Sequence, residues 1–188
     1  MIKIAITGSI ASGKTTASKI LSNKRGPLFS ADNEIKKIYK RDSFKSFLAK
    51  KFNIKKKSNL KDSLKKKILD NNENIKKLEK FIHPLVRKEM IKFSTKNKKN
   101  KKIFYEIPLL IENKLMKYFD VIIFIKTKKA IRLKRFKAKG GNSNLFYLLD
   151  NKQLPDSKKA KLSDHVVKNE KNFNILKKKL LDIIKLYV

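Results

Sequence analysis

Short apolar runs alternate with stretches whose apolar positions follow helical spacing along this chain of 188 residues. The first run, residues 1–7, is rich in β-branched and apolar residues and is short enough for a buried strand. Residues 14–24 carry apolar side chains at helical spacing, which predicts a helix. Further apolar runs predict strands at residues 28–30, 102–107, 121–125 and 164–167. This alternation predicts an α/β fold, in which a mostly parallel five-stranded sheet carries helices on both faces.

Residues 32–101 interrupt the alternation with a long helical pattern. Apolar positions recur there at helical spacing in four groups, Ile35/Ile38/Tyr39, Phe44/Phe47/Leu48, Leu64/Ile68 and Ile75/Leu78/Ile82/Leu85. The end of the stretch, residues 95–102, is a Lys/Asn run that predicts a solvated loop. Because the stretch is far longer than a crossover between parallel strands needs, we expect a helical insertion that forms one wall of a substrate cleft.

The chain closes with an amphipathic helix. Its apolar stripe favours packing into the core over a partner site and consists of Phe173, Leu176, Leu180, Ile183, Ile184 and Tyr187.

The composition is strongly basic, with a net charge of +34 and a pI near 10.3. Such a charge usually indicates a nucleic-acid partner. However, only five of the 50 basic residues are Arg, the residue favoured for bidentate phosphate and base contacts, and the Lys are spread along the whole chain. We therefore expect a compositional background that attracts anionic substrates weakly, and no specific nucleic-acid partner.

The chain has no cysteine, which excludes a disulfide framework and a thiolate zinc site. No apolar run approaches the length that a membrane span needs, and the N-terminus reads as a strand rather than a secretory leader. These features predict a cytoplasmic protein without membrane association, and we expect a monomer.

The run GSIASGKTT begins at Gly8, directly after the first predicted strand. Gly8, four further residues, Gly13, Lys14 and Thr15 form the phosphate-binding loop pattern, placed between a strand and a helix as that pattern requires. The glycines allow a tight turn, while the loop N–H groups and the start of the helix attract anions. Lys14 can reach the β- and γ-phosphates, and the Thr15 hydroxyl can ligate magnesium.

The loop pattern predicts a P-loop NTPase-type fold that binds ATP and Mg²⁺. Its nucleotide-binding core comprises residues 1–31 and 102–188, with the insertion at residues 32–101. Thr15 is the expected metal ligand, and the expected nucleotide-binding residues are Gly8, Ser9, Ile10, Ala11, Ser12, Gly13, Lys14, Thr15 and Thr16. The alternative is a glycine turn that binds nothing.

Three further residues could carry chemistry, and each has a simpler alternative. Asp32 follows the second predicted strand, where a carboxylate can accept a proton from an attacking hydroxyl or hold magnesium through water, or can cap a helix. Glu106 ends the third predicted strand, where it can act behind a metal or be an ordinary acidic strand terminus. His83 stands beside Pro84, and such a histidine is more often structural.

A basic helical stretch carries Arg132, Arg135 and Lys139 and runs into Gly140-Gly141. A basic helix that ends in paired glycines indicates a lid, at about residues 132–152, that closes on polyphosphate. The alternative is a solvated basic face.

Taken together, these motifs resemble the dephospho-CoA kinase family nearly from end to end. TGSIASGKTT is similar to that family's TGGIGSGKST loop. Ser30-Ala31-Asp32 stands where the family has Asp-Ala-Asp, and His83-Pro84-Leu85 resembles its His-Pro-Leu segment. IPLLIE at residues 107–112 is close to its VPLLFE signature. Gln153-Leu154-Pro155, Lys159 and LSDHVVKN at residues 162–169 resemble its tail, which reads QMP, Lys and LADYVIDN.

The resemblance implies transfer of the ATP γ-phosphoryl group to the ribose 3′-hydroxyl of dephospho-CoA. It implies a nucleotide core, a helical substrate domain at residues 32–101 and a small lid. It casts Asp32 as the catalytic base, with Lys14 and Arg135 in catalysis and Lys139 on the nucleotide. The implied substrate contacts are His83, Glu106, Pro108 and Leu109.

Several positions depart from the family pattern. Ser30 replaces the first Asp of Asp-Ala-Asp, and Ser9 and Ala11 replace loop glycines. Lys139 stands where the family carries a lid Arg, so a bidentate phosphate clamp becomes a point charge. Arg132 stands where Gln is common. The alternative functions are another small-molecule P-loop kinase, for a nucleoside or nucleotide, a regulatory nucleotide switch, and a basic nucleic-acid binder.

Overall fold

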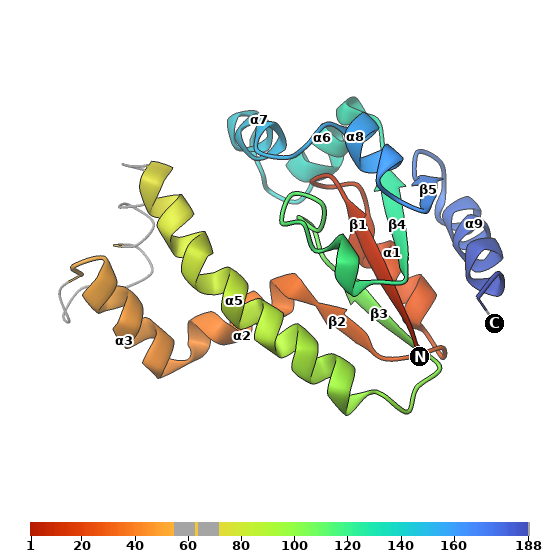
Figure 1. Ribbon diagram of the computed structural model, residues 1–188. Coiled ribbons are helices and arrows are strands. Elements are labelled where there is room, and N and C mark those ends of the chain that lie inside the picture. Colours follow the sequence, from red (N-terminus) through yellow and green to blue (C-terminus); the bar gives the residue numbers. More distant parts are fainter. Residues whose placement is uncertain (55–62, 64–71, 188) are drawn as a thin grey trace. The chain divides into compact units, whose positions relative to one another are not determined.

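A computed structural model describes residues 1–54, 63 and 72–187 (Figure 1). The chain divides into two compact units, one of Met1–Ser30 with Lys96–Val188 and one of Ala31–Thr95. The sequence analysis placed the two divisions at residues 31/32 and 101/102, and the role of the second unit in substrate binding stays a prediction. The predicted apolar pair Leu64/Ile68 lies outside the described residues.

The first unit is built on a five-stranded parallel sheet of order β2-β3-β1-β4-β5. The strands are β1 (Ile2–Gly8), β2 (Leu28–Ser30), β3 (Lys102–Glu106), β4 (Val121–Lys126) and β5 (His165–Lys168). This sheet confirms the predicted fold class, and each predicted strand agrees with the structure to within about a residue at either end. Because β1 lies in the centre, the chain that follows it emerges at the middle of the carboxyl edge.

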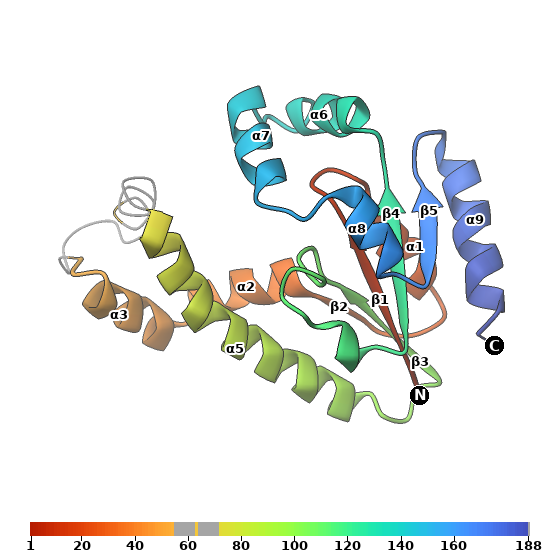
Figure 2. The ribbon, with the colours of Figure 1, turned by 45° about the horizontal axis from the view of Figure 1, so that its top comes forward.

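Helices cover both faces of the sheet (Figure 2). The helices of this unit are α1 (Lys14–Ser22), α6 (Lys129–Lys137), α7 (Ser143–Asn151), α8 (Asp156–Lys161) and α9 (Phe173–Lys185), with a short 3₁₀ turn, η1 (Met116–Tyr118). α1, α8 and α9 lie against the strands, whereas α6 and α7 pack on each other beyond the carboxyl end of β4. α1 and α9 pack on one face through Ala17, Leu21, Leu176, Leu180 and Ile184, which meet Ile4, Ile6, Phe104, Ile123 and Ile125 of the strands. The stripe of α9 is therefore core, as predicted, except that Phe173 at its start is 54% exposed.

The opposite face of the sheet buries the alternate strand residues. α8 contacts β4 there, and in Figure 2 it lies on the other side of β4 from α1. The ring of Tyr105 in β3 meets the ring of Phe119, with 5.0 Å between their centroids, so the segment after β3 also covers this face.

The second unit is helical, with α2 (Ala31–Lys40), α3 (Asp42–Lys51) and α5 (Asn72–Lys96). Its apolar cluster contains Ile38, Phe44, Leu48, Leu78 and Ile82, which are positions that the helical spacing predicted. α5 continues past Pro84 to Lys96, so the predicted solvated loop at residues 95–102 is wrong at its start. The hydroxyls of Ser94 and Thr95 donate to the carbonyls of Met90 and Ile91, a local arrangement that is compatible with a helix.

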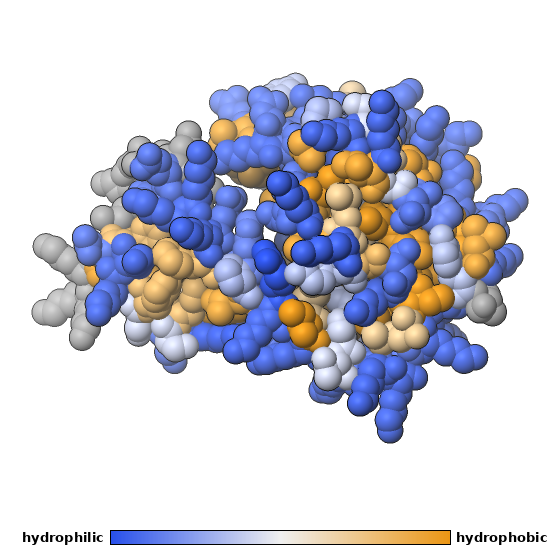
Figure 3. Space-filling view, viewed as in Figure 1, coloured by the Kyte–Doolittle hydropathy of each residue, from blue (hydrophilic) through white to orange (hydrophobic). Residues whose placement is uncertain are grey.

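Hydrophilic side chains are scattered over both units on the face shown in Figure 3, with apolar side chains between them. In the part of the chain that the structure describes, no helix is both long and apolar enough to cross a membrane.

Candidate active site

The glycine-rich loop lies at the carboxyl edge of the sheet, between the end of β1 and the start of α1. Gly8 pairs in register with Ile125 of β4, and α1 begins at Lys14. Gly13 has φ 97°, in the left-handed region that favours glycine, and a Cβ there would lie 2.2 Å from the side-chain amide nitrogen of Asn169. Ala11 also has a positive φ, 57°, at a position where an L-residue is strained.

The second half of the loop is fixed by three side chains that donate to the Ser12 carbonyl. The donors are Asn169 Nδ2 at 2.8 Å, Thr127 Oγ1 at 3.1 Å and Arg135 Nη1 at 3.5 Å. Arg135 also donates from Nη2 to the Asn169 carbonyl at 3.1 Å. These bonds direct the Ser12 carbonyl into the protein, so it does not face an anion. The structure thus brings the predicted residue Arg135 against the loop.

Lys14 and Thr15 stand where the loop passes into α1, and Glu106 reaches Thr15 there. Lys14 Nζ donates to the Ser9 carbonyl at 3.0 Å, and Thr15 Oγ1 donates to Glu106 Oε1 at 2.5 Å. Ser18 Oγ lies 3.5 Å from the other carboxylate oxygen of Glu106, which is 4% exposed. Glu106 ends β3 in register with Ile6 of β1, so the sheet itself carries this carboxylate to the loop.

The hydroxyl of Thr15 and the carboxylate of Glu106 are hard oxygen donors, which suit Mg²⁺. Among residues 1–54, 63 and 72–187, no three His, Cys, Asp or Glu side chains gather into a group that could hold a metal ion. Few protein ligands are typical of Mg²⁺ sites in which substrate phosphates supply other oxygens. The residues present therefore fit a magnesium ion that arrives with a nucleotide.

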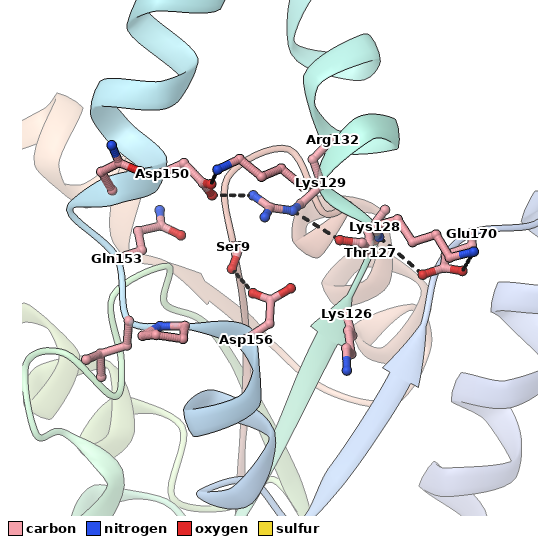
Figure 4. A pocket seen from close by; sticks show the side chains of 13 residues that line it. Ser9, Lys126, Thr127, Lys128, Lys129, Arg132, Asp150, Gln153, Asp156 and Glu170 are labelled. Atoms are coloured by element: carbon pink, nitrogen blue, oxygen red, sulfur yellow. Dashed lines mark hydrogen bonds and ion pairs between the residues drawn. The ribbon is translucent and has the colours of Figure 1, made fainter.

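The first half of the loop rests on side chains from α8 and the segment before it. Ser9 Oγ donates to Asp156 Oδ1 at 2.5 Å, and the Ile10 N–H donates to Gln153 Oε1 at 3.2 Å. Ser9 and both of these partners line a cavity of about 500 Å³, and in Figure 4 Asp156 points toward Ser9. The fully buried Lys159 lies beneath them and pairs with Glu112 at 2.7 Å. The sequence analysis quoted these positions within the resemblance but gave them no role.

In the predicted lid, Arg132 joins α6 to α7 (Figure 4). Its Nη1 lies 2.5 Å from Asp150 Oδ1, its Nε donates to the Thr127 carbonyl at 3.1 Å, and its guanidinium carbon lies over the Phe146 ring, 5.6 Å from the centroid. Arg132 is 5% exposed, so the alternative of a solvated face is wrong for this residue. Although burial raises the pKa of the Asp150 carboxyl, the hydrogen bonds and charges of Arg132 and Lys129 outweigh it and hold that pKa below its ordinary value.

Lys139 does not lie on the same helix as the two arginines. α6 ends at Lys137, and Lys139 is exposed in the turn that leads to Gly140, whose φ is 84°. The sequence analysis was wrong on this point because helical spacing alone did not reveal where the turn begins. A role of Lys139 on the nucleotide stays a prediction.

The remaining predicted residues lie on three segments. Asp32 is the second residue of α2, lies in its first turn and is exposed, and its role as base or cap stays a prediction. A carboxylate in that turn interacts favourably with the helix dipole.

His83 is half-buried within α5. Pro108 and Leu109 follow β3, and the Pro108 carbonyl accepts a hydrogen bond from Thr7 Oγ1 at 3.1 Å, which ties this segment to β1.

The chain matches known proteins over almost its whole length. The model of the dephospho-CoA kinase family matches residues 2–174. A dephospho-CoA kinase of Rickettsia typhi is 34% identical over 192 residues, covering 98% of this chain and 97% of the relative. The solved structure of a dephospho-CoA kinase from Campylobacter jejuni has a TM-score of 0.72 at 26% identity, covering 97% of this chain and 95% of that one. The crystal structure of a protein from Thermus thermophilus has a TM-score of 0.84 at 23% identity, and the match covers 100% of this chain and 98% of that one.

Proposed function

The chain belongs to the dephospho-CoA kinase family, and on that premise we propose that it transfers the γ-phosphoryl group of ATP to the 3′-hydroxyl of dephospho-CoA. The products are coenzyme A and ADP. The observation that supports this most strongly is the arrangement of Lys14, Thr15 and Glu106 at the carboxyl edge of the sheet, at the end of a glycine-rich loop. Parallel α/β sheets bind their ligands at this edge.

ATP phosphates bind along the loop from Gly8 to Thr16. The loop N–H groups and the start of α1 supply partial positive charge, and the Ser12 carbonyl is directed away by its three donors. Lys14 leaves the Ser9 carbonyl and binds the β- and γ-phosphates. Its positive charge there stabilises the charge on the transferring group. Arg135, anchored beside the loop, adds a second positive charge, and Lys139 adds a third when the lid closes.

Thr15 would ligate Mg²⁺ through its hydroxyl, and Glu106 would orient that hydroxyl or accept hydrogen bonds from metal-bound water. When bound at these residues, the ion would supply positive charge that offsets the charge of the phosphate oxygens.

Asp32 is proposed as the general base. A ribose hydroxyl is a poor nucleophile at neutral pH, and a carboxylate that accepts its proton in the transition state contributes roughly 10²–10⁴-fold. Support comes from the family pattern at Ser30-Ala31-Asp32 and from the chain itself. Ser30 pairs in register with Glu106, and Asp32 follows it by two residues.

The acceptor is proposed to bind through the second unit, with His83 from α5, and through Pro108 and Leu109 after β3. The enzyme is proposed to act in the cytoplasm as a monomer. Its high lysine content attracts anionic substrates without selecting a nucleic acid.

The test offers dephospho-CoA, pantetheine phosphate, adenosine and shikimate side by side and measures ADP release with each. Of the four compounds, we expect only dephospho-CoA to support turnover. Its product should be phosphorylated at the ribose 3′-hydroxyl. Turnover with adenosine or shikimate in its place would identify a different small-molecule kinase. ATP-independent binding of DNA at physiological salt would favour a nucleic-acid function.

A further inference from the structure

We propose that Lys159 is a positioning residue for phosphoryl transfer, which fixes the first half of the phosphate loop from beneath. The proposal rests on the proposed kinase function and adds a residue that never touches the substrate. Its basis is a set of contacts around one buried ammonium group, all within the first unit.

Lys159 is 0% exposed, which is unusual in a chain whose lysines mostly lie at the surface. Its ammonium has three protons, and three acceptors surround it. Glu112 Oε1 lies 2.7 Å from Nζ, Gln153 Oε1 lies 3.2 Å away and Ser9 Oγ lies 3.4 Å away. Each acceptor belongs to a different segment, namely the turn after β3, the segment before α8 and the phosphate loop. The buried charge therefore joins three parts of the unit at one point.

One of these contacts ends on the loop itself, and a second reaches the loop through Gln153. Ser9 Oγ accepts from Lys159 and donates to Asp156, so that hydroxyl is held both as an acceptor and as a donor. Gln153 Oε1 accepts from Lys159 and also from the Ile10 N–H. The side chain of one loop residue and the backbone of the next are thus both held through Lys159.

The same residue, Ser9, connects this support to the reacting end of the loop. Its carbonyl accepts the hydrogen bond of Lys14 Nζ, while its hydroxyl is held by Lys159. A shift of Ser9 would therefore displace the backbone that cradles the phosphates and, before ATP binds, the position in which Lys14 is held. Misplacement by about 1 Å can cost on the order of 10²-fold in rate.

Glu112 supplies the negative charge that pairs with Lys159, and its presence complicates a simple substitution of Lys159. Its Oε1 also accepts from the Leu154 N–H at 3.1 Å, and its Oε2 is buried without a hydrogen-bond partner in the described part of the chain. Removal of Lys159 alone would leave a buried carboxylate uncompensated, which destabilises a protein whatever the lysine does for catalysis. The test must separate these two effects.

The experiment compares Lys159→Met, Glu112→Gln and the double variant with wild type. Lys158→Met is the matched control, because Lys158 is exposed on the same helix. Thermal unfolding measures stability. Calorimetry measures the affinity for ADP, which depends on the geometry of the phosphate loop. ADP release with dephospho-CoA gives kcat and KM. We expect Lys159→Met to lose both stability and activity. In the double variant we expect unfolding to return toward wild type while kcat/KM stays roughly 10–100-fold low and ADP binds more weakly. Lys158→Met should match wild type in all three.

A double variant that recovers kcat/KM and ADP affinity together with stability would overturn the proposal, since the pair would then be structural only. If Lys159→Met does not fold, Gln153→Met carries the test. It removes the acceptor that links Lys159 to the Ile10 N–H and leaves the ion pair intact. We expect a several-fold rise in the Kd for ADP with little change in unfolding, and wild-type affinity would contradict the proposal. ADP binding does not depend on which substrate receives the phosphoryl group. This result would therefore stay interpretable if the assignment of dephospho-CoA as that substrate were wrong.

Discussion

Thr15 and Glu106 are separated by 91 residues in the chain, yet the Thr15 hydroxyl donates directly to the Glu106 carboxylate. The parallel register of β1 and β3 brings them together, because it places the end of β3 beside the strand that leads into the loop. The hydroxyl expected to ligate the metal is thereby oriented by a buried carboxylate.

Loss of the Thr15 hydroxyl should weaken magnesium use. Thr15→Ala is expected to raise the Mg²⁺ concentration needed for half-maximal turnover by about 10-fold or more, the scale of losses seen when the groups around a metal are disturbed. Thr15→Ser keeps the hydroxyl and should stay close to wild type. A metal titration of ADP release checks both variants. Identical titration curves for Thr15→Ala and wild type would remove Thr15 from the metal site.

Lys14 should be needed for turnover but not for folding. Lys14→Ala removes the positive charge next to the transferring group, and we expect kcat to fall by about 10²–10³-fold or more. Lys19→Ala, an exposed lysine of α1, is the control and should keep full activity. ADP release and thermal unfolding measure the two effects. Near wild-type turnover of Lys14→Ala would contradict the phosphate-loop assignment.

Asp32→Asn should separate chemistry from binding. The amide keeps the size of the side chain but cannot accept the proton, so transfer to dephospho-CoA should fall by roughly 10²–10⁴-fold while ATP affinity changes little. Glu34→Gln, in the same helical turn, is the matched control. Single-turnover measurements with saturating ATP give the rate of the chemical step. If Asp32→Asn reacts normally, the base must be sought elsewhere, with Glu106 the next candidate.

Ala11→Gly should relieve backbone strain in the loop. A left-handed φ, such as that of Ala11, costs an L-residue roughly 1–2 kcal/mol. Glycine gives the unfolded chain more conformational entropy, which makes folding less favourable by about 0.4–1 kcal/mol. The net expectation is a gain of about 0.5–1 kcal/mol in the free energy of unfolding, measured by urea denaturation. A clear loss of stability would show that the methyl group contributes packing that outweighs the strain.

The contribution of Asp150 to stability should depend on pH. Because its folded pKa lies below the ordinary value, its pairing with Arg132 and Lys129 stabilises the fold above the unfolded pKa, near 3.9. That stabilisation is lost as the pH falls through the lower, folded pKa. Asp150→Asn should therefore cost roughly 2 kcal/mol at pH 7 and progressively less as the pH falls below 4. A difference that is constant from pH 7 to pH 3 would contradict this account.

The sequence predicted the sheet and the loop because both are encoded locally. Apolar runs mark buried strands wherever they stand, and the spacing of Gly8, Gly13 and Lys14 defines a turn that needs no distant partner. Glu106 was found for the same reason, since the end of a parallel strand is a known position at the carboxyl edge.

The supports of the loop could not be predicted in the same way. Lys159 contacts Ser9 across 150 residues, and nothing in a lysine-rich helix distinguishes its one buried member from its exposed neighbours. The burial of Arg132 against Asp150 was not predicted, because helical spacing does not show which side of α6 faces the protein. Burial of a charged side chain is decided by its tertiary partners, here Glu112 and Asp150.

The position of the second unit has a consequence for how this architecture diversifies. Residues 31–95 are one unbroken piece of chain, inserted between β2 and β3, which are parallel neighbours in the sheet. Any segment that leads from the end of one such strand to the start of the next satisfies the topology, provided it is about a dozen residues or longer. An exchange of this single segment therefore leaves the strand order and the nucleotide loop intact. On the proposed assignment, such an exchange replaces the acceptor site together with the proposed base, Asp32, and keeps the nucleotide-binding loop.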